Sequence, residues 1–199
     1  MARPVKPTGR IIALAALSAL AIAAYGIWSA GGFDRDGFLS ASRLTARHSF
    51  LWFMLVWSAS ALATLWPGGW RSALLYNRRG VGLGFAAAHL IHAGFFITAI
   101  VVYGAPTSPT TLFGGGLGYV FVILMALTSR DYWVKRLTPQ GWKLLHTIGA
   151  VYIAFIFAFS YYGRLPTKPA LAIATLSLMA LVIALRVAAW AKKRAPRPA

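Results

Sequence analysis

The sequence predicts an all-α fold, a polytopic membrane bundle of about six transmembrane helices, and three observations carry this prediction. Hydrophobic residues make up 59% of the 199 residues and charged residues 12%, roughly half the charged fraction of a soluble domain. The apolar residues gather in six runs, most of them near the ~20 residues that cross a bilayer as a helix. Gly and Pro residues, which favour turns, separate the runs. We therefore expect a single transmembrane domain over residues 1–199.

The first three predicted spans each end at a break in the apolar pattern. The first, Ile11–Ala30, follows basic residues, and its uncharged run exceeds the roughly 7–15 apolar residues of a signal peptide, so we expect a retained helix. Phe50–Pro67 ends at a Pro-Gly-Gly turn, and Val81–Tyr103 ends shortly before Pro106.

The last three predicted spans are also bounded by turn-forming residues. Phe113–Leu127 is short, and three successive glycines near its start predict an irregular beginning or close helix packing. Gly141–Tyr162 follows Pro139. Ala170–Ala191 follows Pro169 and leads into a basic tail over residues 192–199.

The basic residues predict the orientation of the chain. The net charge is +17, and most Lys and Arg residues fall in the tails and in the second and fourth connections between spans. By the positive-inside rule, this distribution places both termini in the cytoplasm. An anionic lipid bilayer is the expected partner of this charge, and we do not expect nucleic acid to be one.

Ionisable residues are scarce within the predicted spans. The three acids, Asp34, Asp36 and Asp131, lie in connections, and no Lys or Arg is expected near the middle of a span. Proton-coupled transporters and pumps normally use intramembrane ionisable groups, so this class is disfavoured. Because the chain has no Cys, disulfides, thiolate metal sites and covalently attached haem are excluded.

Four histidines remain as candidates for chemistry. His48 is expected at the membrane interface, whereas His89 and His92 lie inside the third predicted span and His146 inside the fifth. A buried imidazole in lipid needs a hydrogen bond or a metal, and imidazoles from two helices can hold a haem iron between them. Depths counted at about 1.5 Å per residue do not decide whether His89 or His92 would face His146.

Three basic residues near these spans are candidates to bind haem propionates. Arg78 and Arg79 precede the third predicted span, and Lys143 lies near the start of the fifth. Charge-assisted hydrogen bonds to carboxylates are strong, but the positive-inside rule explains the same residues without a haem.

Two stretches resemble the ferric-reductase-like transmembrane domain family. Residues 77–92 (NRRGVGLGFAAAHLIH) resemble the family's R-R-x-x-G-L followed ten residues later by His. Residues 127–152 (LTSRDYWVKRLTPQGWKLLHTIGAVY) resemble its T-S, basic R-L, W-x-x-L-H and downstream Tyr. The resemblance covers roughly residues 49–162, with the helices in matching order.

The resemblance implies that the chain binds b-type haem and passes electrons across the membrane. Carried over by position, the axial iron ligands are His92 and His146, while His89 has no counterpart and is an alternative ligand or a hydrogen-bonding neighbour. Many members carry a second histidine 13 residues after the first on the fifth span, where this chain has Phe159. We therefore expect one haem at most.

These observations predict a single-haem electron-transfer protein of the bacterial inner membrane. The chain lacks a soluble nucleotide-binding unit, so a cytoplasmic flavoprotein or a quinone would be the electron donor. The acceptor would lie in the membrane or be a periplasmic protein. Two alternatives stay open: a scaffold or small-molecule transporter that binds no cofactor and uses its histidines structurally, and a haem enzyme that reduces ferric chelates at the membrane surface.

Overall fold

The computed structural model describes residues 7–195, and every helix or strand assigned in that range is an α-helix. Two of the helices, α3 and α6, are short, and the other six have the length and hydropathy needed to cross a membrane. The prediction of an all-α bundle with six long apolar helices is confirmed. The helices are α1 (Thr8–Ser29), α2 (Arg35–Leu65), α3 (Gly69–Tyr76), α4 (Arg78–Val101), α5 (Pro109–Leu127), α6 (Asp131–Arg136), α7 (Thr138–Tyr162) and α8 (Pro169–Arg194).

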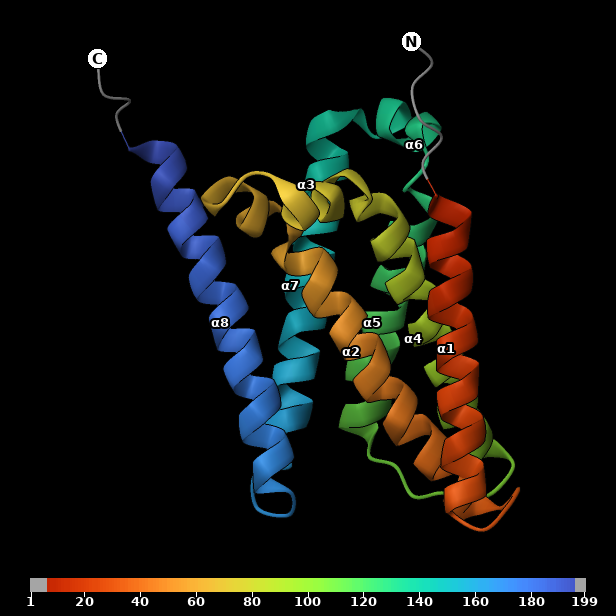
Figure 1. Ribbon diagram of the computed structural model, residues 1–199. Helices are drawn as coiled ribbons and strands as arrows, with labels where there is room; N and C mark the ends of the chain where they lie inside the picture. The colour runs from red at the N-terminus through yellow and green to blue at the C-terminus, as the bar shows by residue number, and fades with distance from the viewer. Residues whose placement is uncertain (1–6, 196–199) are drawn as a thin grey trace.

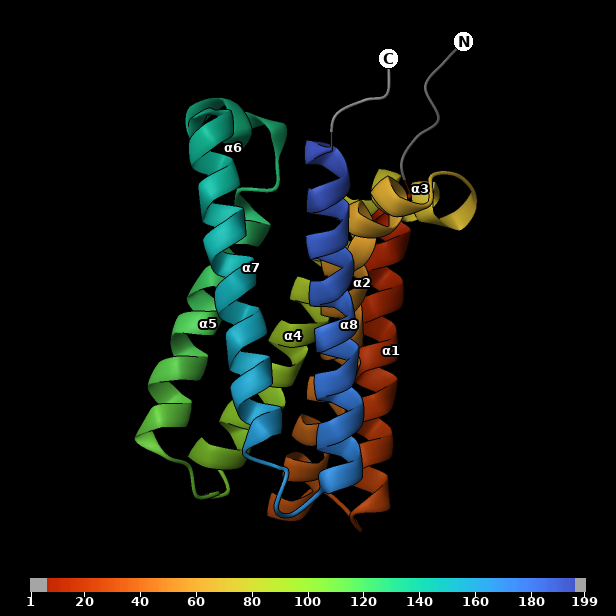
Figure 2. The same ribbon diagram turned by 90° about the vertical axis from the view of Figure 1, so that its left-hand side faces the viewer.

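The long helices lie side by side, and the connections gather at the two ends of the bundle (Figure 1). One end carries α3 and α6. The start of α1 and the end of α8 lie at the same end, because the chain crosses the bundle six times. The other end carries the loops from α1 to α2, α4 to α5 and α7 to α8. Viewed from the side, α5 and α7 form one edge of the bundle, α1 and α2 lie at the other edge behind α8, and α4 lies between the two groups (Figure 2). Helices α1, α2 and α4 pack against one another.

The second long helix begins 15 residues before the predicted Phe50. Asp34 caps it, because its carboxylate accepts a hydrogen bond from the backbone N–H of Gly37 at 2.8 Å. The first turns then bury small residues, including Ala41 and Thr45. The charged residues of this stretch lower its mean hydropathy to that of a loop, although the opposite face of the helix is buried in the bundle.

The fourth long helix also differs from the prediction at its start. Ser108 caps it by accepting a hydrogen bond from the N–H of Thr111 at 3.1 Å, and Pro109 occupies its first turn. The three glycines at residues 114–116 therefore lie inside a regular helix, and the expected irregular beginning is absent.

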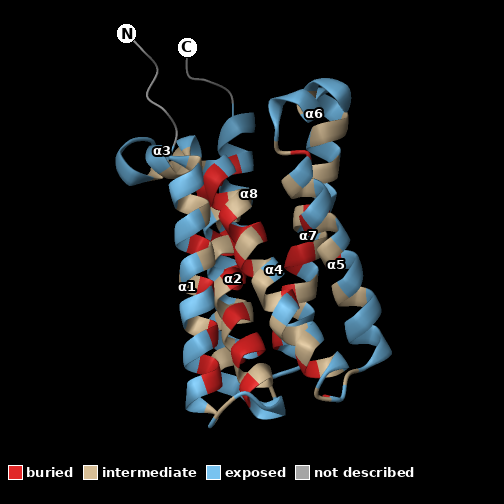
Figure 3. Cartoon of the chain, turned by 90° about the vertical axis from the view of Figure 1, so that its right-hand side faces the viewer, coloured by how far each residue is buried: buried red, intermediate tan, exposed pale blue. Residues whose placement is uncertain are grey.

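Small residues are buried where α1 packs against α2 and α4, whereas aromatic side chains such as Phe50, Phe53 and Phe85 form the main core cluster. Ala15, Ala19 and Ala23 of α1 are fully buried, and Gly26 lies so close to α2 that an added Cβ would be 2.7 Å from the Cα of Ala41. Close backbone approach over small residues is typical of helices packed in membranes. Many other large apolar side chains are exposed on the outer faces of the helices. Buried residues form an inner stripe and exposed residues the outside (Figure 3).

Candidate functional site

His48 lies within the bundle, 13 residues after the start of α2, and not at the helix start as predicted. Its Nε2 accepts a hydrogen bond from the indole N–H of Trp52 at 3.1 Å and lies 3.0 Å from the hydroxyl of Ser18 on α1. His48 therefore joins α1 to α2, which corrects its interpretation as an interfacial side chain.

His89 and His92 both direct their Nδ1 atoms at α2. The Nδ1 of His89 lies 2.9 Å from the hydroxyl of the fully buried Ser49, and the Nδ1 of His92 donates to the backbone oxygen of Ser42 at 2.9 Å. Within residues 7–195 no hydrogen bond reaches the Nε2 atom of either ring. The ring of Tyr119, on α5, lies 4.9 Å from that of His89.

His146 lies where α7 packs against the end of α5. Its ring stacks on Trp142 with the ring centroids 4.0 Å apart, and its Nε2 lies 3.3 Å from the hydroxyl of Thr128. That hydroxyl donates its proton to the backbone oxygen of Leu124 at 2.6 Å, so it acts as acceptor from the His146 Nε2–H. The indole N–H of Trp142 donates to the backbone oxygen of Thr128 at 2.9 Å, so Trp142 and His146 both bond Thr128 and join α7 to the end of α5.

The structure does not bring His89 or His92 level with His146. The α7 side chain beside His89 is Phe157, with ring centroids 5.6 Å apart, and Phe157 follows His146 by 11 residues. Eleven residues span about 16 Å of helix, whereas two imidazoles bound to one metal at about 2 Å each have their nitrogens about 4 Å apart. His92 lies deeper still, so the predicted pair of axial ligands, His92 and His146, does not face one position for an iron.

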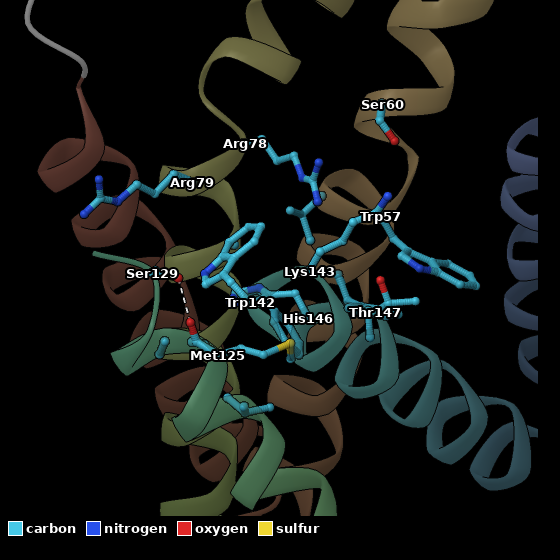
Figure 4. A pocket seen from close by; sticks show the side chains of 18 of the residues that line it. Trp57, Ser60, Arg78, Arg79, Met125, Ser129, Trp142, Lys143, His146 and Thr147 are labelled. Atoms are coloured by element: carbon cyan, nitrogen blue, oxygen red, sulfur yellow. Dashed lines mark hydrogen bonds between the residues drawn. The ribbon is translucent and has the colours of Figure 1, made fainter. Parts of the chain in front are cut away.

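A cavity of about 770 Å³ lies between α2, α4, α5 and α7, at the end of the bundle that carries α3 and α6. Four of the six predicted cofactor-binding residues line it, namely His146, Arg78, Arg79 and Lys143 (Figure 4). His89 and His92 do not line it, although Phe85, which does, lies 5.3 Å from the ring of His89. The cavity thus includes His146 but not His89 or His92.

The cavity has an excess of positive charge. Arg78, Arg79, Lys143 and Arg186 line it, and Asp131 is its one lining carboxylate. Asp131 forms an ion pair with Arg79 at 3.3 Å, and both side chains are exposed. The other cations have no carboxylate in the lining, so an anionic ligand would complete the electrostatics of the cavity.

Arg186 is the cavity residue that sequence reasoning missed. It lies eight residues before the end of α8, about 12 Å into the helix. Its Nη1 donates to the backbone oxygen of Trp57 at 2.9 Å, and the guanidinium carbon lies 5.0 Å from the Trp57 ring centroid. A single Arg within the apolar run ALVIALRVAAW was the available signal, because an intramembrane charge usually marks a functional position.

The chain matches no protein-family model, no curated protein and no solved structure. Its resemblance to the ferric-reductase-like transmembrane domain family thus remains a hypothesis that rests on the two motifs in α4 and around the start of α7.

Proposed function

We propose that this chain is a membrane electron-transfer protein that binds one haem b in the cavity beside His146. The observation that carries the proposal is the convergence of His146, Arg78, Arg79 and Lys143 on one cavity of about 770 Å³. Its volume lies within the roughly 300–1,000 Å³ of ligand sites. An imidazole and a set of cations are the groups that would bind the iron and the two propionates of this cofactor.

His146 is the proposed iron ligand. Its Nε2 is 3.3 Å from the hydroxyl of Thr128, a long distance for a hydrogen bond, so iron ligation would replace a weak hydrogen bond and would also change the stacking of the ring on Trp142. On the α4 side the lining consists of Gly82, Phe85 and Ala86 together with the two arginines, and none of these is an iron ligand. We therefore expect α4 to supply no iron ligand, in contrast to the His92–His146 pair that the family resemblance implies.

The electron donor and acceptor must be separate molecules. When bound, the haem would supply one-electron transfer. The connections are short, the longest loop between helices in residues 7–195 being that between α4 and α5, so a flavoprotein or a quinone is the proposed donor. By the positive-inside rule, the end with α3 and α6 would face the cytoplasm of a bacterial cell, and a membrane or periplasmic molecule would be the acceptor.

The experiment is to purify the protein in detergent from haem-replete cells and to record reduced-minus-oxidised spectra. We expect a b-type α-band in the wild type and in His48→Ala, which removes an interhelical histidine outside the cavity. We expect His146→Ala to lose haem and His92→Ala to keep it. A colourless wild-type protein would refute the function, and haem lost from His92→Ala but kept in His146→Ala would refute the ligand assignment.

A second candidate, a membrane scaffold without a cofactor, is favoured by a different observation. Each of the four histidines already contacts a polar atom outside its own helix: Ser18, Ser49 and Ser42 lie on other helices, and Thr128 directly follows the end of α5. Interhelical bonds of this kind contribute about 0.6 kcal/mol on average in membranes. If the wild type carries no haem and the four alanine variants only lower its melting temperature, the scaffold is the better description.

A further inference from the structure

We propose that Arg186, on α8, binds a propionate of the cofactor, so that the sixth long helix also contributes to the haem site. This inference rests on the proposed function and extends it to a helix that lies outside the stretch of family resemblance. It makes Arg186 a positioning residue for the haem, distinct from the iron ligand and from the basic residues identified in the sequence.

The first support is the environment of the Arg186 side chain. Arg186 is half-buried, whereas Arg78, Arg79 and Lys143 at the rim are exposed and can be solvated. A guanidinium carries five N–H donors, and the bond to the backbone oxygen of Trp57 uses one of them. A half-buried cation inside an apolar helix is costly unless it is paired, and a carboxylate with two oxygens matches the guanidinium fork.

The second support is an unsatisfied donor beside Arg186. The indole N–H of Trp57 is buried and has no hydrogen-bond partner, and Trp57 also lines the cavity. A buried donor without a partner costs roughly 1–3 kcal/mol relative to a paired one, so its retention suggests an acceptor supplied by a ligand. Ser60, one turn further along α2, adds a hydroxyl to the same wall (Figure 4).

The third support is repulsion between cations. Arg78 is close enough to Arg186 for their like charges to interact, and Asp131, the one carboxylate of the lining, is paired with Arg79. An anion between Arg78 and Arg186 would remove this repulsion. The other two acidic residues of the chain, Asp34 and Asp36, do not line the cavity, so such an anion would be supplied by a ligand.

The test compares haem with haem dimethyl ester, in which both propionates are uncharged, by titrating each into detergent-purified protein freed of haem. Arg186→Gln should weaken haem binding about tenfold or more, the usual value of a hydrogen bond to a charged group, and leave binding of the diester unchanged. Lys192→Gln is the matched control, because Lys192 also donates from α8 to a backbone oxygen of α2, that of Leu65 at 3.1 Å, but does not line the cavity.

The outcomes separate the inference from the function on which it rests. If Arg186→Gln weakens the binding of haem and of the diester equally, Arg186 only holds α8 against α2. If it weakens the binding of neither, the proposal is also overturned. Partial recovery of haem affinity in Arg186→Lys would support it. A wild-type protein that binds neither ligand would refute the proposed function itself, and anionic phospholipid found in that protein would identify a lipid head group as the occupant of the basic cavity.

Discussion

Replacement of Gly26 by alanine should destabilise the bundle because the added methyl group would overlap with backbone atoms of α2. The new Cβ would lie 2.7 Å from the Cα and 2.8 Å from the N of Ala41, and backbone atoms cannot turn aside as a flexible side chain can. Overpacking costs about 1–3 kcal/mol, and the rigid neighbour indicates the upper end of this range. Alanine regains about 0.5–1 kcal/mol of helix stability over glycine, so the net loss is about 2 kcal/mol.

The assay is thermal unfolding of the detergent-solubilised protein. For a chain of this length, about 2 kcal/mol corresponds to a decrease of about 4–8 °C in Tm. Gly94→Ala is the control, because Gly94 is exposed on α4 and an added Cβ would meet nothing within 4 Å, so its Tm should stay constant or rise. Equal melting temperatures for the two variants would refute the close packing of α1 on α2.

Three further predictions concern the histidines, the exposed ion pair and the orientation. Ser49→Ala should lower Tm more than Ser42→Ala, because the first removes the hydroxyl that contacts His89 while the second leaves the backbone acceptor of His92 in place; equal shifts would contradict these contacts. Asp131→Asn should change the unfolding free energy by less than about 1 kcal/mol, because the pair with Arg79 is exposed, and a loss of several kcal/mol in chemical denaturation would contradict this. The chain contains no Cys, so Ser72→Cys on α3 introduces a single thiol. This thiol should react with an impermeant maleimide only after the membrane is opened to expose the cytoplasmic side, and labelling in intact spheroplasts would contradict the predicted orientation.

Hydropathy was sufficient to predict the fold class because each of the six long helices contains a stretch of 18 residues with high mean hydropathy. The same measure misplaced the start of α2, since Arg35, Arg43 and Arg47 lie on a helix whose other face buries Ala41 and Thr45. A profile averages the two faces of a helix, whereas packing depends on one of them. The cap at Asp34 was the local signal that marked the true beginning.

Part of the candidate site was also predictable from composition. Arg78, Arg79 and Lys143 were identified because basic residues gather at one end of membrane helices, and the cavity lies at that end. Arg186 was overlooked because it stands alone in an apolar run. Its relation to the cavity depends on how α8 lies against α2, which no local pattern in α8 encodes.

The relative depth of the histidines could not be predicted because it depends on where each helix begins along the bundle axis. Counting from the nearest turn assumes that α4 and α7 start at one level. His89 is 11 residues beyond the start of α4, and its neighbour Phe157 is 19 residues beyond the start of α7, so α7 begins about 12 Å further out. This offset places His146 near the basic rim and leaves His89 and His92 to bond α2, and therefore a cofactor bound through His146 would be held at one end of the bundle and not at its centre.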